Sequence, residues 1–220
     1  MKRLPLLAAA LLLAGCANRP PAPDWQVESQ GAMQRAVAAY FAGDARVEAL
    51  EFTRARRAVA STGQPDQVAR AELLRCAARV AATVFEPCAG FEPLGRDASP
   101  PERAYADYLG GGLPPAQAGL LPEAQRGIAA LPAGTDPTAA VRGIADPLAR
   151  LVAAGVLLRQ GRATPGVAAL AVESASAQGW RRPLLAWLGV QARAAETAGD
   201  AAEAARLKRR MDLVETEPRP

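Results

Sequence analysis

The side chains with the most reactive chemistry in this sequence are its three cysteines, because the chain contains no histidine. Histidine is the commonest general base and a frequent metal ligand, so its absence removes the usual catalytic pairs with serine or cysteine. Cys16, Cys76 and Cys88 are spaced neither as a Cys-x-x-Cys redox motif nor as a set of metal ligands. The sequence also has no Gly-x-Ser-x-Gly element and no phosphate-binding loop. It therefore predicts no metal, no cofactor and no enzymatic activity.

Residues 1–16 have the order of an export signal. A short cationic start, Met-Lys-Arg, precedes an apolar run over residues 4–13, and the string Leu-Ala-Gly-Cys ends at Cys16. The apolar run is shorter than the roughly 20 residues of a membrane-spanning helix, which favours a cleaved segment. This stretch resembles the bacterial lipobox. The resemblance implies cleavage after Gly15 and lipidation of Cys16, which then anchors the mature protein to a membrane.

The residues after Cys16 indicate a destination and a tether. Ala17 stands where aspartate would direct inner-membrane retention in enterobacterial-type sorting, so the sequence resembles an outer-membrane lipoprotein that faces the periplasm. Residues 16–24 contain three prolines and no apolar periodicity. We expect this segment to be an extended tether of the polyproline type.

Cys76 and Cys88 are predicted to form a disulfide bond. The export signal places them in the periplasm, which is an oxidising compartment where paired thiols close. Cys76 lies inside an expected helix and Cys88 lies just beyond its end. The bond would therefore fold the following loop back along that helix, whereas the alternative is a pair of buried thiols.

The sequence predicts one all-α domain over residues 25–214. Apolar residues recur at spacings of three and four, and the breaks between these runs carry the glycine, aspartate and proline residues typical of helix ends. Residues 86–135 contain eight prolines and the run Gly110-Gly111-Gly112, so we expect short helices joined by long loops there. Residues 215–220 are predicted to be a disordered tail. The expected helices cover residues 24–42, 44–61, 66–85, 101–109, 122–131, 146–160, 164–178, 182–199 and 200–214.

Two turns share one pattern, in which a glycine ends a helix and an aspartate starts its partner. They are Gly43-Asp44 and Gly199-Asp200, and Gly161 marks a third turn of this kind. The flanking helices have the lengths of antiparallel hairpins, and these spans resemble tetratricopeptide repeats. The resemblance implies a repeat-like array with a concave surface that binds protein. The tryptophan, Leu-Gly and tyrosine positions of that family are not met in one register, and an irregular helical bundle is the alternative.

Two groups of residues near the C-terminus are candidates for partner binding. Trp180 and Trp187, with leucines beside them, form either an exposed aromatic patch or part of the core. Arg206, Arg209 and Arg210 form either a contact for a protein or anionic lipid, or a solvated face that complements the helix dipole. The formal net charge of the whole chain is only +4, which favours no nucleic-acid partner.

Glu28-Ser29, followed by Gly-Ala-Met-Gln at residues 31–34, is superficially similar to elements of lytic transglycosylases, which cleave peptidoglycan with one glutamate. The spacing is compressed and the aromatic groove residues of that family are missing, so we interpret Glu28 as an acidic residue that complements the first helix turn. The expected function is a non-enzymatic, protein-binding scaffold or an accessory of an envelope assembly or secretion machine. The alternatives are an enzyme or accessory of peptidoglycan metabolism, and a carrier that holds a lipid or small molecule between helices.

Overall fold

The structure, a computed structural model, describes residues 21–216. The signal peptide, Cys16 with the start of the tether, and residues 217–220 lie outside the described residues, so the expectations for them stay predictions. Pro23, at the end of the expected tether, has the backbone angles of polyproline II (φ −57°, ψ 145°). Within residues 21–216, no helix combines the length and the apolar character needed to cross a membrane.

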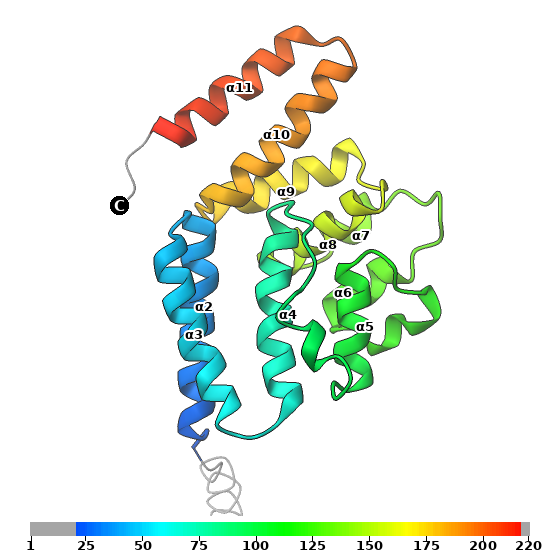
Figure 1. Cartoon of the computed structure of the whole chain (residues 1–220). Helices are drawn as coiled ribbons and strands as arrows, with labels where there is room; N and C mark the ends of the chain where they lie inside the picture. The colour runs from blue at the N-terminus through cyan, green and yellow to red at the C-terminus, as the bar shows by residue number, and fades with distance from the viewer. Residues whose placement is uncertain (1–20, 217–220) are drawn as a thin grey trace, which may run out of the picture.

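The described residues form helices joined by turns and loops, with no strand among them, which confirms the all-α class (Figure 1). The elements are α2 (Asp24–Ala42), α3 (Ala45–Ala60), α4 (Pro65–Ala81), η2 (Glu92–Leu94), α5 (Pro100–Leu109), η3 (Pro115–Leu120), α6 (Glu123–Ala129), α7 (Thr138–Arg142), α8 (Pro147–Arg159), α9 (Pro165–Ala177), α10 (Arg181–Thr197) and α11 (Ala201–Thr216).

Two of the predicted hairpins form at the glycine-aspartate turns. Gly43 ends α2 with a left-handed backbone (φ 88°), and the Asp44 carboxylate accepts a hydrogen bond of 3.0 Å from the Val47 N–H at the start of α3. Gly199 (φ 75°) and Asp200 repeat this arrangement between α10 and α11. Helices α8 and α9 form a third hairpin at their own glycine turn (Figure 1).

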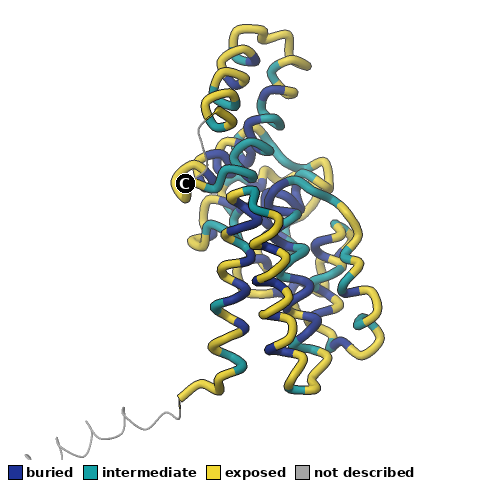
Figure 2. The backbone as a smooth tube through the Cα atoms, turned by 60° about the vertical axis from the view of Figure 1, so that its left-hand side comes forward, coloured by how far each residue is buried: buried dark blue, intermediate teal, exposed yellow. Residues whose placement is uncertain are grey.

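Helices α4 and α8 pack closely at the centre of the molecule, where the buried residues concentrate (Figure 2). Every residue of α8 from 151 to 157 is buried. Gly155 lies so close to α4 that a Cβ atom at this position would overlap the backbone carbonyl of Val80. The absence of a side chain at Gly155 therefore sets the separation of the two central helices.

Gly155→Ala is expected to lower the free energy of unfolding by about 1–3 kcal/mol, because the new methyl group forces α8 away from the Val80 carbonyl. Gly127 in α6 is the matched control, since nothing lies within 4 Å of a Cβ atom placed there. Gly127→Ala should raise stability by about 0.5–1 kcal/mol through helix propensity alone. Urea unfolding followed by circular dichroism measures both changes. If both substitutions raised the free energy of unfolding by the same amount, Gly155 could not lie in contact with the Val80 carbonyl.

The proline-rich middle of the chain packs on the central helices. Burial raises the pKa of Tyr108, and its hydroxyl donates a hydrogen bond of 2.7 Å to the side-chain oxygen of Gln125. The amide of Gln125 in turn donates to the backbone carbonyl of Ala149 at 2.9 Å. This buried chain of hydrogen bonds joins α5, α6 and α8. The short helices expected here are therefore part of the core.

The third helix ends earlier than the sequence predicts. Helix α4 ends at Ala81, whereas the apolar pattern extends it to Phe85. Thr83 adopts a left-handed backbone (φ 58°), and the Val84 N–H donates to the carbonyl of Arg79 at 2.9 Å. A continuing helix cannot include this turn, which redirects the chain towards Cys88.

The disulfide between Cys76 and Cys88 is present and confirms the sequence prediction. The two Cα atoms are 5.8 Å apart, and the bond holds the loop after α4 against that helix. Both cysteines are half-buried and pack against the main core.

Other helix ends also differ from expectation. Asp24 is the first residue of α2 and not its cap, because Pro23 precedes the helix. Helix α11 continues to Thr216, two residues past the expected end and into the segment that was predicted to be disordered. The short helix α7 was not predicted, since its apolar pattern covers little more than one turn.

Candidate functional site

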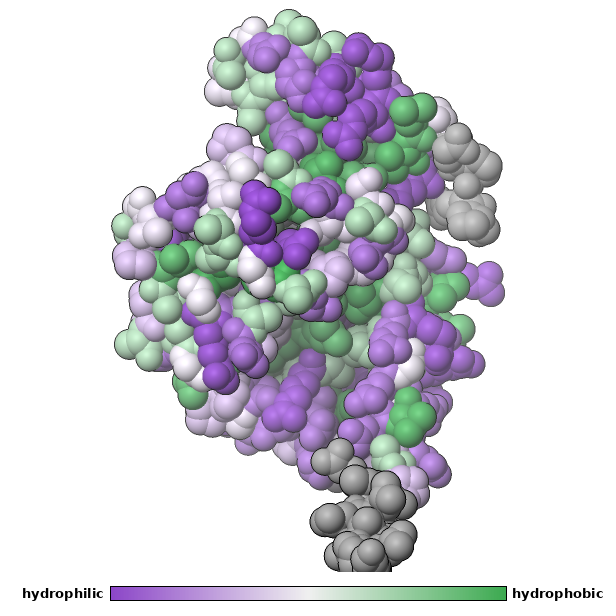
Figure 3. All heavy atoms as spheres, turned by 180° about the vertical axis from the view of Figure 1, so that it is seen from behind, coloured by the Kyte–Doolittle hydropathy of each residue, from purple (hydrophilic) through white to green (hydrophobic). Residues whose placement is uncertain are grey.

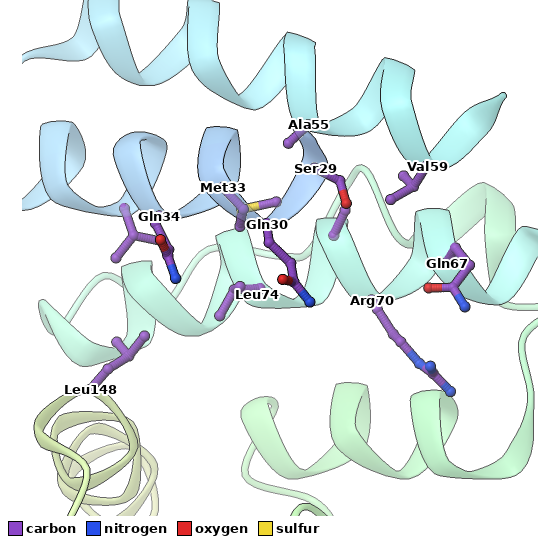
Figure 4. Close-up of a pocket in the computed structure, with 12 residues that line it drawn as sticks. Ser29, Gln30, Met33, Gln34, Ala55, Val59, Gln67, Arg70, Leu74 and Leu148 are labelled. Atoms are coloured by element: carbon purple, nitrogen blue, oxygen red, sulfur yellow. The ribbon is translucent and has the colours of Figure 1, made fainter. Parts of the chain in front are cut away.

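A groove of about 640 Å³ lies between α2 and α4, and it is the candidate functional site (Figure 4). Its residues come from α2, α3 and α4, with one contribution from the start of α8. They are Ser29, Gln30, Met33, Gln34 and Val37 of α2, Ala55 and Val59 of α3, Gln67, Arg70, Ala71 and Leu74 of α4, and Leu148 of α8.

The floor of the groove is apolar. Met33, Ala55 and Val59 are buried, and Leu74 packs against them from α4. These residues belong to a small hydrophobic core between the first hairpin and α4, separate from the main core. The groove is therefore the accessible surface of that small core, where an apolar group from outside can be buried.

The rim of the groove carries amide and guanidinium groups. Gln30 and Gln34 lie one turn apart on α2, and their side chains point towards α4, which carries Gln67 and Arg70 (Figure 4). Each glutamine amide both donates and accepts hydrogen bonds. The Ser29 hydroxyl already donates to the carbonyl of Gln26 at 3.1 Å. The rim thus offers polar partners on both sides of an apolar floor.

Buried glutamates paired with arginines hold the helices around the groove in register. Each pair joins one helix to the next along the chain, from α2 through to α5, and a buried carboxylate without such a partner would be costly. The pairs are Arg35–Glu51 at 2.8 Å, Arg75–Glu48 at 2.7 Å, Arg56–Glu72 at 2.7 Å and Arg70–Glu102 at 2.5 Å. The last pair fixes Arg70 at the rim while more than half of its side chain stays exposed.

The sequence analysis did not find this network. The apolar pattern of α3 predicts that Val47 and Leu50 face inward and that Glu51 is solvated. In the structure, Val47 is 40% exposed and Leu50 is 54% exposed. Glu48 and Glu51 are both buried. A signal is present in the chain, because in two of the pairs the arginine precedes the glutamate by 16 residues. With that spacing, each residue of a pair lies about one to two helical turns from the loop between the two antiparallel helices, so the two side chains can meet.

The chain has no match that assigns it to a family. No family model, no curated protein and no solved structure matches it. The resemblances to the lipobox and to tetratricopeptide repeats therefore stay predictions. Function has to be inferred from the groove and the surfaces around it.

The two tryptophans that were candidates for partner binding belong to the core. Trp187 is fully buried, and its indole N–H donates to the Ala81 carbonyl at 3.0 Å, so the structure supports the core alternative for this residue over an exposed patch. Trp180 is half-buried, with its ring centroid 4.7 Å from that of Phe41. Both side chains attach α10 to the rest of the molecule.

The other candidates lie outside the groove. Arg206, Arg209 and Arg210 are on α11, and Glu28 is exposed on α2 but does not line the groove. Among the described residues, no cluster of three or more histidine, cysteine or acidic side chains could hold a metal ion. Of the residues that the sequence singled out, the groove includes Ser29, Met33 and Gln34 of the transglycosylase-like stretch, but not Glu28 or the C-terminal candidates.

Proposed function

We propose that this protein is a lipid-anchored periplasmic scaffold without enzymatic activity, and that it holds a short, extended segment of another envelope protein in the groove between α2 and α4. The observation that carries the proposal is the combination of an apolar floor with amide groups on both rims. An extended peptide needs both features, because its side chains can be buried while its backbone groups require hydrogen-bond partners.

The polar rim favours an extended segment over a helix. A helix satisfies its own backbone groups and would need only the apolar floor. Gln30, Gln34 and Gln67 instead provide donors and acceptors along both edges. The lining residues of α2 run from Ser29 to Val37, a distance of about 12 Å at 1.5 Å per residue. An extended chain covers this length with about four residues.

Photocrosslinking in cells tests the occupant of the groove. A photoreactive amino acid at Gln34, and separately at Gln67, is expected to give adducts with the same short protein segment, because the two positions lie on opposite rims. The exposed Gln117 in η3 is the control position. The adducts are mapped by mass spectrometry of the crosslinked peptides. Glycan adducts would contradict the proposal in favour of peptidoglycan metabolism, and lipid or small-molecule adducts would contradict it in favour of a carrier.

Leu74→Arg should reduce the adduct yield from Gln34 about tenfold, because a charged side chain on the floor cannot be buried beneath the bound segment. Leu120→Arg is the matched control, since Leu120 is an exposed leucine on η3. Gln67→Ala removes one rim amide and leaves the floor intact, and we expect a smaller decrease. Circular dichroism verifies that each variant is folded. Equal yields from both arginine variants would rule out the groove as the binding site.

The anchoring part of the proposal is tested separately. Cys16→Ser removes the thiol that would carry the lipid, so the protein is expected to leave the membrane fraction and to keep an uncleaved signal. Fractionation followed by intact mass spectrometry measures both effects. Retention of a lipid mass on the variant would contradict lipidation at Cys16. If the Cys16→Ser variant still forms adducts from Gln34 or Gln67, binding in the groove does not depend on the lipid anchor.

A further inference from the structure

Helix α11 is the outermost helix of the described structure, and it leaves a broad face uncovered. It packs against α10 through Ala204 and Leu207, its two buried residues. The α10–α11 hairpin projects from the end of the molecule opposite the start of α2 (Figures 1 and 2). Seen from behind, this hairpin presents many hydrophilic residues beside a hydrophobic area (Figure 3).

The uncovered face of α11 combines positive charge with an exposed leucine. Arg206, Arg209, Arg210 and Leu213 are spaced by three, one and three residues, which places them on one side of the helix. We call these four residues the α11 cationic face. With Asp212 and Thr216 they line a hollow of about 500 Å³. Leu213 is 66% exposed, the largest exposure among the big apolar residues of the described chain.

Two of the three guanidinium groups lack a hydrogen-bonded partner among the described residues, although the charge of Arg210 helps to lower the pKa of Glu203. Arg206 forms two hydrogen bonds of 2.6 Å with Glu203, which raise the pKa of the arginine and lower that of the glutamate. Arg209 and Arg210 form no ion pair with any described residue. The hollow is therefore positively charged even with Asp212 at its edge.

We propose that the α11 cationic face is a second docking surface, which binds an acidic segment of a partner protein through its guanidinium groups and buries an apolar side chain of that segment against Leu213. Charge complementarity selects carboxylates, which pair with arginine in a bidentate geometry. Burial against an exposed leucine stabilises the contact beyond what solvated ion pairs provide.

Two features favour an acidic protein segment over an anionic bilayer. All residues that line this open hollow lie along α11, so one acidic segment running along the helix can contact them together. The hairpin also lies at the opposite end from the start of α2 (Figure 1), so a membrane reached through Cys16 would approach the other end of the described structure. This second point rests on the proposed lipid anchor, but the charge and shape of the face do not.

The test uses the full-length lipoprotein in its own envelope, with a photoreactive amino acid in place of Leu213. We expect crosslinks to protein segments rich in aspartate and glutamate. The double variant Arg209→Glu, Arg210→Glu should decrease the adduct yield about tenfold, because two attractive contacts become repulsive. The control is Arg46→Glu, Arg57→Glu, which makes the same change in charge at two exposed positions on α3.

The outcomes separate this proposal from the others. Loss of the adduct in the α11 variant, and not in the α3 variant, supports an acidic partner at this face. Adducts with lipid, segments without acidic residues, or equal yields from the two double variants would overturn it. The neutral double variant Arg209→Gln, Arg210→Gln should give an adduct yield between those of the parent and the glutamate variant. Such a graded response would show that the lower yield comes from the change in charge and not from unfolding of α11. Crosslinks from Gln34 in the groove should persist in every α11 variant, so a failure here is distinct from a failure of the groove proposal.

Discussion

Trp187→Ala is expected to lower the free energy of unfolding by about 3–5 kcal/mol. The side chain is fully buried in the main core, where α10 packs across the end of α4. Removing it leaves a large cavity, and it also leaves the Ala81 carbonyl without the indole N–H that now lies 3.0 Å away. Domains of this size are stable by about 5–15 kcal/mol in total. The variant should therefore unfold at a much lower urea concentration than the parent protein.

Two further variants identify why Trp187→Ala lowers the free energy of unfolding. Trp187→Phe keeps much of the volume and removes the hydrogen bond, so we expect about half of the destabilisation. Leu213→Ala removes an exposed apolar side chain and should change stability by less than about 0.5 kcal/mol. A loss below about 1 kcal/mol for Trp187→Ala would contradict its burial. It would reopen the earlier interpretation of this tryptophan as a partner-binding residue.

The hairpins could be predicted because their signals are local. A glycine in the left-handed conformation followed by a capping side chain specifies a helix end and a helix start within a few residues, as at Gly43 and Asp44. Thr164 and Asp146 cap α9 and α8 in the same way. Each of these turns was found from the sequence, whereas the end of α4 was not, because it depends on a left-handed threonine with no sequence signature.

The groove could not be predicted because its residues become neighbours only through tertiary packing. Gln34 and Gln67 belong to helices that do not follow one another directly, and no sequence motif links the two residues. Burial is also unexpected for the charged side chain of Glu51, and ion pairs with Arg35 and Arg54 make that burial possible. Trp187 could not be assigned from the sequence alone, since a large aromatic residue among leucines is consistent with either a core or an interface.

Loss of the Cys76–Cys88 disulfide is expected to cost about 3 kcal/mol, since the bond closes a short loop and restricts the unfolded chain. The double variant Cys76→Ala, Cys88→Ala and the reduced parent protein should show the same decrease in urea midpoint. A reducing agent should have no effect on the double variant, which serves as the control. Identical midpoints for the oxidised and reduced parent would contradict a structural role for the bond.

The structure also predicts where the reduced protein opens first. The loop held by the disulfide brings Gly90 so close to Glu72 that a Cβ atom on the glycine would overlap the carboxylate. Opening this loop exposes Glu72 and with it the Arg56–Glu72 pair that joins α3 to α4. Hydrogen exchange should therefore accelerate first over residues 82–98 and next in the facing turns of α3 and α4. Because those helices contribute to the floor of the groove, reduction should also decrease crosslinking from Gln34, which would link the redox state of this disulfide to the proposed binding site.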